Sequence, residues 1–220
     1  MRIRLGTVRQ SPFVGIFALA TEKAVFVPMG ISGKERKMLE QVFETEVIQA
    51  SVANSSLLGV LAVANEKGII LPEIAEQREQ AELEKQGFRV KKVENIAALG
   101  NIIEVNSGRG ICAEFLPEKQ RREIERFLSI ELKQASIGGS DLVGANCVAT
   151  NKGFLISPKA TEKEFKAIKR HFGNEGTRAT ANYGDSFIAN SVAANSSAAI
   201  VGLHTTGHEL SRIDDGLTGA

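Results

Sequence analysis

The chain has few of the residues that characterise several common classes of protein. Its 220 residues include two cysteines, no tryptophan and one tyrosine. Two thiols cannot supply the disulfide framework of a small secreted domain, so we expect a reducing, cytoplasmic compartment. No run of about 18 apolar residues occurs, which excludes a membrane-spanning helix. Near the N-terminus charged and apolar residues alternate, unlike the pattern of a signal peptide.

An excess of charge of one sign is also missing. The formal net charge is +1, and 43% of the residues are hydrophobic. Proteins that bind nucleic acid regardless of its sequence usually carry a clear basic excess, so this class is disfavoured, although contact with RNA through a small patch is compatible with the composition. The length suffices for a well-buried core in one large domain or two small ones.

The chain does contain a short repeat motif, in which two apolar residues precede a small one, at five places. The small residues are 44, 41, 44 and 45 positions apart, and the step across the two chain ends is 46. A repeat whose last copy is split between the termini predicts a closed ring, because an open array would end in polar capping repeats. The copies are Phe13-Val14-Gly15, Leu57-Leu58-Gly59, Ala98-Leu99-Gly100, Leu142-Val143-Gly144 and Phe187-Ile188-Ala189.

Each repeat begins with a predicted β-hairpin, which is clearest in the second copy. Residues 57–65 are apolar or small, Glu66-Lys67-Gly68 reads as a turn, and residues 69–72 run back. Apolar runs separated by a short turn containing glycine are typical of a hairpin. The second strand is predicted to end at a proline in three repeats, where a missing N–H costs least: Pro28, Pro72 and Pro158.

A helix follows each predicted hairpin. Three helices begin with a capping box, in which a hydroxyl and a glutamate three residues later satisfy free backbone N–H groups of the first turn. A fourth starts at Pro117, which suits the first helical position. The second-repeat helix, expected over residues 75–86, is much more polar. The three capping boxes are Ser32…Glu35, Thr161…Glu164 and Thr206…Glu209.

A third strand connects each helix to the next repeat motif. Shifting the sequence by 44 lays Ile3 on Val47 and Gly15 on Gly59, so the N-terminal segment reads as a third strand with no hairpin before it. The fifth repeat has a hairpin and a helix but no third strand. The sequence therefore predicts an α/β fold, a five-bladed propeller with pseudo-fivefold symmetry, strands inside and helices outside, whose last unit is closed by the N-terminal strand. We expect one domain, 1–220, with repeats at about 15–58, 59–99, 100–143, 144–188, and 189–220 plus 1–14.

Several of these segments together resemble one known family. They are Ala98-Leu99-Gly100-Asn101, Ser136-Ile137 ahead of Leu142-Val143-Gly144, and Gly202-Leu203-His204-Thr205-Thr206 ahead of Glu209-Leu210-Ser211. In this order and at these intervals they resemble translation initiation factor six, the ribosome anti-association factor of archaea and eukaryotes, over essentially the whole chain. Because the chain stops at Ala220, shortly after the last predicted helix, it is more similar to the archaeal form.

The resemblance implies the pentein α/β propeller and a role without catalysis. It implies that the protein binds the large ribosomal subunit on its intersubunit face, near the sarcin-ricin loop and an adjacent ribosomal protein. Occupation of that face would block joining of the small subunit, with a further part in large-subunit biogenesis. We accordingly expect a monomer with no cofactor, no metal, no membrane contact and no small-molecule substrate.

The small residues of the repeat motif and the residues just after them are the candidate contact points. Glycine lets another molecule approach the backbone, and asparagine amides can hydrogen-bond a docked protein segment or RNA backbone. The alternative is that the glycines relieve crowding at the ring centre and the asparagines satisfy buried neighbours. The candidates are Gly15, Ile16, Gly59, Val60, Gly100, Asn101, Gly144, Asn146, Ala189 and Asn190.

Two alternative functions follow from the predicted architecture. Pentein folds also carry guanidino-modifying enzymes, whose chemistry needs a thiolate, a histidine and carboxylates. Cys112 and Cys147 lie in apolar segments without the basic or glycine-rich setting that lowers a thiol pKa, which favours buried structural cysteines. The second alternative is a ring-shaped scaffold for another protein.

The three histidines carry weak signals for catalysis or metal binding. His171 is expected at a helix end, where it can cap carbonyl groups. His204 and His208 are four residues apart, but the predicted cap Thr206 stands between them, so they do not share a helical face as zinc ligands on a helix would.

Overall fold

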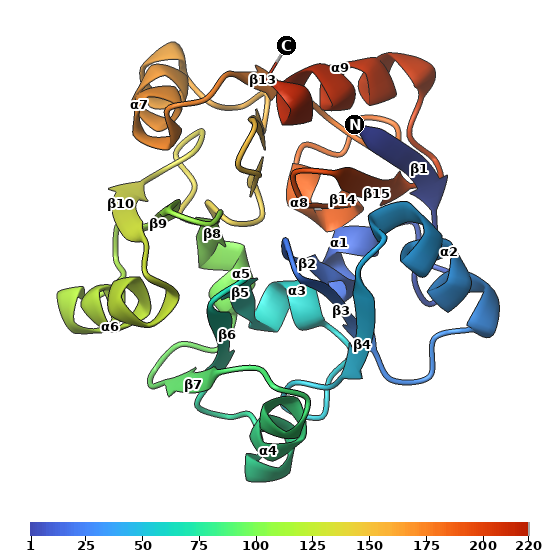
Figure 1. The fold of residues 1–220 in the computed structure, drawn as a ribbon. Coiled ribbons are helices and arrows are strands. Elements are labelled where there is room, and N and C mark those ends of the chain that lie inside the picture. The colour runs from blue at the N-terminus through green and yellow to red at the C-terminus, as the bar shows by residue number, and fades with distance from the viewer. Residues whose placement is uncertain (220) are drawn as a thin grey trace.

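The computed structural model describes residues 1–219, which form a ring of repeating units around one axis (Figure 1). The first unit contains α1 (Val14–Phe17), β2 (Leu19–Ala20), β3 (Ala24–Pro28), α2 (Gly33–Phe43) and β4 (Glu46–Ala50). The second contains α3 (Leu58–Leu61), β5 (Val63–Asn65), β6 (Gly68–Pro72), α4 (Gln77–Lys85) and β7 (Val90–Val93). The third contains α5 (Leu99–Ile102), β8 (Ile103–Val105), β9 (Arg109–Ala113), α6 (Glu118–Leu128) and β10 (Glu131–Ala135).

The last two units follow the same plan with one variation each. The fourth has a turn in place of the short first helix, followed by β11 (Cys147–Ala149), β12 (Phe154–Ile156), α7 (Glu162–Phe172) and β13 (Gly176–Arg178). The fifth has α8 (Ile188–Ser191), β14 (Val192–Ala194), β15 (Ala198–Gly202) and α9 (Gly207–Thr218), and takes its third strand, β1 (Arg2–Gly6), from the N-terminus.

Residues 1–219 build five three-stranded sheets of identical topology. In each sheet the middle strand pairs antiparallel with the first strand and parallel with the third. β1 runs parallel to β15 from Arg2 opposite Ala198 to Gly6 opposite Gly202, just as β4 pairs with β3. The predicted closure of the last unit by the N-terminal strand is therefore confirmed, and so is the five-bladed propeller.

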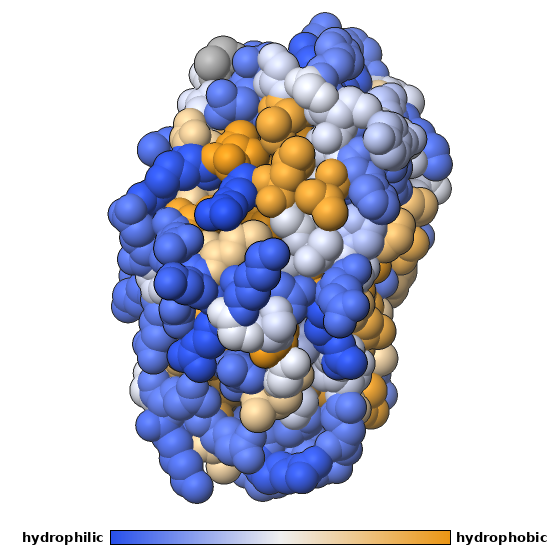
Figure 2. Space-filling model, turned by 90° about the vertical axis from the view of Figure 1, so that its right-hand side faces the viewer, coloured by the Kyte–Doolittle hydropathy of each residue, from blue (hydrophilic) through white to orange (hydrophobic). Residues whose placement is uncertain are grey.

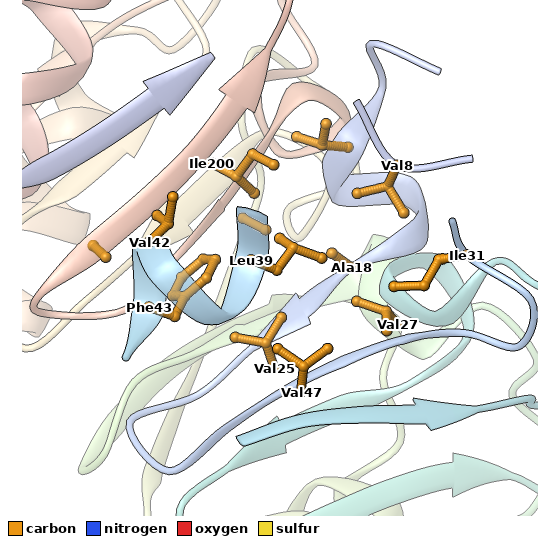
Figure 3. Packing of buried hydrophobic residues seen from close by; sticks show 13 residues of the cluster. Val8, Ala18, Val25, Val27, Ile31, Leu39, Val42, Phe43, Val47 and Ile200 are labelled. Carbon is orange, nitrogen blue, oxygen red and sulfur yellow. The ribbon is translucent and has the colours of Figure 1, made fainter. Parts of the chain in front are cut away.

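The long helices fill the wedges between neighbouring sheets at the periphery of the ring. α2 directs Leu39 and Phe43 into a cluster with Val25 and Val47 of its own sheet and Ile200 of the fifth unit (Figure 3). Full burial of one such side chain contributes about 1.5 to 3 kcal/mol. Each cluster thus joins two blades, so no blade buries its core alone.

The helix starts agree with the predicted capping boxes in detail. Ser32, Thr161 and Thr206 each accept a backbone hydrogen bond and receive the reciprocal contact of a glutamate. α4 spans Gln77–Lys85, within the range expected, and has a box that the sequence analysis missed because glutamate is an unusual cap, formed by Glu76 and Glu79. The prediction for Pro117 was wrong by one position. Its ψ of 146° is extended, so it is the cap residue and α6 begins at Glu118.

The repeat motif has a different local structure from the one predicted. Residues 57–65 were read as one apolar strand, but Leu58–Leu61 form the one-turn helix α3, and β5 begins only at Val63. The first, third and fifth units have corresponding short helices, α1, α5 and α8. A one-turn helix brings the small residue of the motif against the neighbouring copy, which an extended strand would not.

Backbone packing at the axis explains why the motif contains small residues. A Cβ atom on Gly59 would lie 1.9 Å from the Gly15 carbonyl oxygen, and one on Gly100 would lie 1.9 Å from that of Gly59. Gly144 faces Gly100 in the same way at 2.1 Å, and Gly15 faces Ala189 at 1.9 Å. Real Cβ contacts do not come this close, so each glycine is required by the carbonyl group of the adjacent copy.

We predict that Gly100→Ala destabilises the ring. The added methyl group forces adjacent backbones apart, and overpacking of this kind costs about 1 to 3 kcal/mol, or more where backbone must move. Gly33→Ala is the matched control, because a Cβ at the start of α2 meets nothing within 4 Å. Urea unfolding monitored by circular dichroism measures both variants. Equal midpoints would contradict the axial packing described above.

Candidate functional site

The ring has two end surfaces with different residues. The repeat motifs, the ends of the second strands and the starts of the long helices lie at one end, because the third strand runs parallel to the second and delivers the chain to the next motif. We call this end the motif face; it carries the first residue of each motif, namely Phe13, Leu57, Ala98, Leu142 and Phe187. The other end, the hairpin face, carries the hairpin turns at Glu22, Glu66, Ser107, Asn151 and Ser196.

The motif face is apolar. Phe13, Leu57 and Leu142 are 40%, 37% and 39% exposed, and further apolar side chains follow the ends of the second strands. Seen from its side, the molecule has apolar side chains along one edge, whereas the opposite edge is mainly hydrophilic (Figure 2). The exposed large hydrophobic residues among residues 1–219 all belong to this end: Phe13, Met29, Leu57, Ile74, Phe115, Leu142, Tyr183 and Leu203. Such a concentration is typical of interaction surfaces.

These exposed residues were not among the predicted contact residues. Phe13, Leu57 and Leu142 are the first residues of the repeat motif, in which only the small residues and those just after them were candidates. Met29 and Leu203 each stand three positions before a helix cap, where a polar residue would be expected on a solvent-facing loop. Their recurrence at equivalent places in several repeats was the available signal.

The structure separates the ten predicted contact residues into two groups. Gly15, Gly59, Gly100, Gly144 and Ala189 form the backbone ring, where close neighbours surround them. Ala189 donates its N–H to the Ala145 carbonyl at 3.1 Å, and Ala145 donates to Asn101 at 3.1 Å, so the same ring is also hydrogen-bonded. These five positions therefore fix the backbone at the centre of the motif face.

The residues that follow the small ones reach the surface, except in the fourth unit. Ile16, Val60, Asn101 and Asn190 are partly exposed. Between residues 1 and 219 neither the Asn101 nor the Asn190 side-chain amide has a hydrogen-bond partner. Asn146 differs, because it is buried and its amide donates to the Leu142 carbonyl at 2.9 Å. Asn101 and Asn190 are thus the amides available to a partner.

The hairpin face satisfies its own polar groups. The Asn65, Asn106 and Asn195 amides donate to the carbonyls of Leu128, Thr150 and Thr21 at 3.0 to 3.1 Å. The Glu22 carboxylate accepts from the Ser196 hydroxyl at 2.6 Å and from the Asn151 amide at 3.1 Å. Most of these bonds link hairpin turns of different units, so many polar groups at this end already have partners.

The axis encloses a small cavity that contains one carboxyl group. The cavity measures about 60 Å³ and is lined by Gly59, Gly100 and residues of the first strands. Glu104 accepts a hydrogen bond from the Ala149 N–H at 2.6 Å. Removal from bulk water raises the pKa of Glu104 to about 8, and the Ala149 bond offsets only part of this effect.

The thiols and histidines do not assemble into a catalytic group. Burial raises the pKa of Cys112 to about 12, and burial together with the nearby Glu104 raises that of Cys147 well above its ordinary value. Both thiols therefore stay protonated at neutral pH, which is unfavourable for nucleophilic attack. His171 lies in the last turn of α7, as predicted, but its Nε2 lies 2.8 Å from the Gly110 carbonyl oxygen in β9 and not from a carbonyl of its own helix.

The described part of the chain has no cluster of metal ligands and no membrane-spanning helix. Over residues 1–219 no three His, Cys, Asp or Glu side chains are grouped as metal ligands would be. His204 precedes the Thr206 cap and stacks on Tyr183, with ring centroids 6.2 Å apart, whereas His208 lies within α9. None of the helices in this range is long and apolar enough to cross a bilayer.

Comparison with known proteins identifies similar sequences and folds. The eIF-6 family profile matches residues 3–216. Translation initiation factor 6 of Picrophilus torridus is 31% identical over 98% of this chain and 100% of the relative, and that of Methanobrevibacter smithii is 34% identical over 98% and 97%. The solved DDAH of Pseudomonas aeruginosa, complexed with citrulline, has a TM-score of 0.50 at 13% identity and covers 94% of this chain and 73% of that chain. That likeness concerns the fold alone, and it confirms the predicted pentein architecture.

We predict that Glu104→Gln removes a specific pH dependence of stability. The pKa of Glu104 in the folded state, about 8, lies above its value in the unfolded chain, so the folded state holds an extra proton between pH 4.5 and about 8. The folded protein therefore loses stability as pH rises through this range, by up to about 5 kcal/mol at 1.4 kcal/mol per pKa unit. Urea midpoints at pH 5 and pH 8 measure the effect, with the exposed Glu131→Gln as control. Parallel pH profiles for wild type and Glu104→Gln would refute the assignment.

Proposed function

This chain belongs to the eIF-6 family, and we propose that it binds the intersubunit face of the large ribosomal subunit and sterically prevents association with the small subunit. Its relatives are translation initiation factors, a role that requires no chemistry. The proposed partners are a ribosomal protein and ribosomal RNA near the sarcin-ricin loop. Occupation of the same face during maturation is compatible with a second part in large-subunit biogenesis.

The exposed apolar residues of the motif face are the observation that carries this proposal. A standard protein interface covers about 800 Å² on each partner, and buried apolar area contributes about 25 cal/mol per Å² before the costs of association. Phe13, Leu57 and Leu142 supply apolar area around the ring, while the Asn101 and Asn190 amides supply hydrogen bonds that fix orientation. We propose that Ile16 and Val60 contact the partner directly, and that the motif glycines and Ala189 hold that surface in place.

Rigidity supports a steric mechanism. The axial backbone ring and the two-blade clusters fix the units relative to one another, so the protein loses little conformational entropy when it docks. A rigid disc of this kind keeps a second large body away from the surface that it covers. The thiol pKa values, raised by burial, fit a protein that acts by occupancy and not by nucleophilic chemistry. We propose that it works as a cytoplasmic monomer without a cofactor.

We expect the protein to co-sediment with purified large ribosomal subunits and not with small ones. Added before the two subunits are mixed, it should reduce the peak of joined ribosomes in a sucrose gradient in proportion to its occupancy. Failure to co-sediment with large subunits at low salt would refute the proposal. Co-sedimentation without any loss of joined ribosomes would refute the steric mechanism alone.

We further expect Asn101→Arg to weaken large-subunit binding at least tenfold. A bulky charged side chain in place of a partly exposed amide separates the docked surfaces and must be desolvated. The thermal transition should stay within about 2 °C of wild type, because surface substitutions change stability by about 0.5 kcal/mol. Lys152→Glu, on the exposed hairpin face, is the control and should bind normally. Equal loss in both variants would place the contact elsewhere.

A further inference from the structure

A groove on the outer side of the ring remains unexplained by either end face. It measures about 510 Å³ and lies between β1 and α2, and its upper end reaches Leu203 of the motif face. Figure 2 looks at the side that carries α2 and β1, and shows apolar side chains gathered in its upper part among hydrophilic ones. The residues that line this groove include Arg4, Leu5, Lys34, Lys37, Met38 and Leu203.

One edge of β1 is open in this groove. β15 is the single strand that pairs with β1 among residues 1–219. The Arg2 N–H donates to the Ser197 carbonyl at 3.2 Å, so the backbone groups of Arg2 face β15. Because alternate residues of a strand direct their backbone groups to opposite edges, those of Ile3 and Leu5 face outward. They are the groups that an additional strand would bond.

The cover of β1 differs from that of its counterpart in the first unit, β4. α9 packs on β12 and β13 of the preceding unit, whereas α2 packs on β1, β15 and β4. Val47 in β4, which corresponds to Ile3 in the repeat, is 4% exposed, whereas Ile3 and Leu5 are only partly buried. The strand supplied by the N-terminus is therefore covered less well than its counterpart in the first unit.

The chemistry of the groove combines an apolar base with a cationic rim. Met38 and Leu203 provide the base, and the Leu5 side chain packs on the other face of β1. Arg4, Lys34 and Lys37 are exposed, and no carboxylate in residues 1–219 forms an ion pair with them.

The one acidic residue in the groove wall is already engaged. The Glu35 carboxylate accepts from the Gln10 N–H at 2.9 Å and from the Ser32 N–H at 3.1 Å, so it serves the start of α2. The groove consequently presents unpaired positive charge beside an open strand edge.

We propose that this groove binds an extended acidic segment of a partner protein, which adds to the outer edge of β1 as a fourth strand. Backbone hydrogen bonds to Ile3 and Leu5 would provide affinity, as in other cases of strand addition. Alternate side chains of the segment would point to the two faces of the sheet, apolar ones beside Ile3 and Leu5 and carboxylates beside Arg4 and Lys37. RNA fits less well, because aliphatic side chains give its bases no stacking surface.

A second groove on the ring provides a matched comparison. It lies between β10 and α7, measures about 370 Å³ and includes Lys133 and Lys163. Glu114 also lines it, and the Lys133 ammonium group donates to the Ala167 carbonyl at 3.2 Å. Its charge is therefore more nearly balanced, and we expect no comparable binding there.

The test uses a fluorescein-labelled peptide of about eight residues in which glutamate and valine alternate. A strand rises about 3.3 Å per residue, so this peptide is long enough to run along all five residues of β1. Fluorescence anisotropy at low salt should show binding to the wild-type protein. The double variant Arg4→Glu with Lys37→Glu should bind at least tenfold more weakly, whereas Lys133→Glu with Lys163→Glu should bind like wild type. A peptide of the same sequence N-methylated at every residue should lose binding, because neither of its edges then has N–H groups to donate to the ladder.

Four outcomes would overturn the proposal. The first is no binding of the peptide to the wild-type protein, and the second is equal binding of the N-methylated peptide. The third is an equal loss of affinity in the two double variants. The fourth is displacement of the peptide by an RNA oligonucleotide of equal charge, together with peptide binding that does not depend on the peptide backbone. Thermal transitions of both double variants, which alter side chains on the outer surface, establish that they are folded.

Discussion

Close contact between backbones at the axis is the constraint on which the rest of this structure depends. Gly59 and Gly100 each lie directly against the carbonyl group of the preceding copy, so the distance between neighbouring units is set by main chain and not by adjustable side chains. With that distance fixed, the sheets diverge outward and leave wedges, which the long helices fill. The cluster of Leu39, Phe43 and Ile200 is one such wedge, and it explains why each helix is apolar on one side (Figure 3).

The same constraint gives the two ends of the ring different properties. At the hairpin face the turns converge, and Asn65, Asn106 and Asn195 bond neighbouring carbonyls, which uses up the polar groups there. At the motif face the small residues of the one-turn helices contact the backbone of the neighbouring copy. The residues just before these helices are left at the surface, which is why Phe13 and Leu57 are exposed although they belong to an apolar motif. The apolar face is a geometric consequence of the closed axis.

Most of the architecture could be predicted from the sequence, because it depends on local signals such as helix caps and on the regular spacing of the repeats. The capping boxes at Ser32, Thr161 and Thr206 mark helix starts by side-chain chemistry alone, and the split repeat predicts the pairing of β1 with β15. The conformation of the motif could not be predicted, because apolar residues beside glycine suit a strand and a one-turn helix equally well. The raised pKa of Glu104 and the exposure of Phe13 depend on contacts between repeats, and the spacing of residues along the chain does not reveal these contacts.

The axis also bears on how one fold can serve both enzymes and binding proteins. Pockets for small molecules usually measure about 300 to 1,000 Å³, and the cavity around Glu104, at about 60 Å³, is far smaller. The thiols closest to a catalytic role, Cys112 and Cys147, are held protonated by burial. With its centre filled by backbone, the ring has only its outer surfaces left for recognition. Those surfaces carry large side chains on rigid elements, which suits a large partner better than a small substrate.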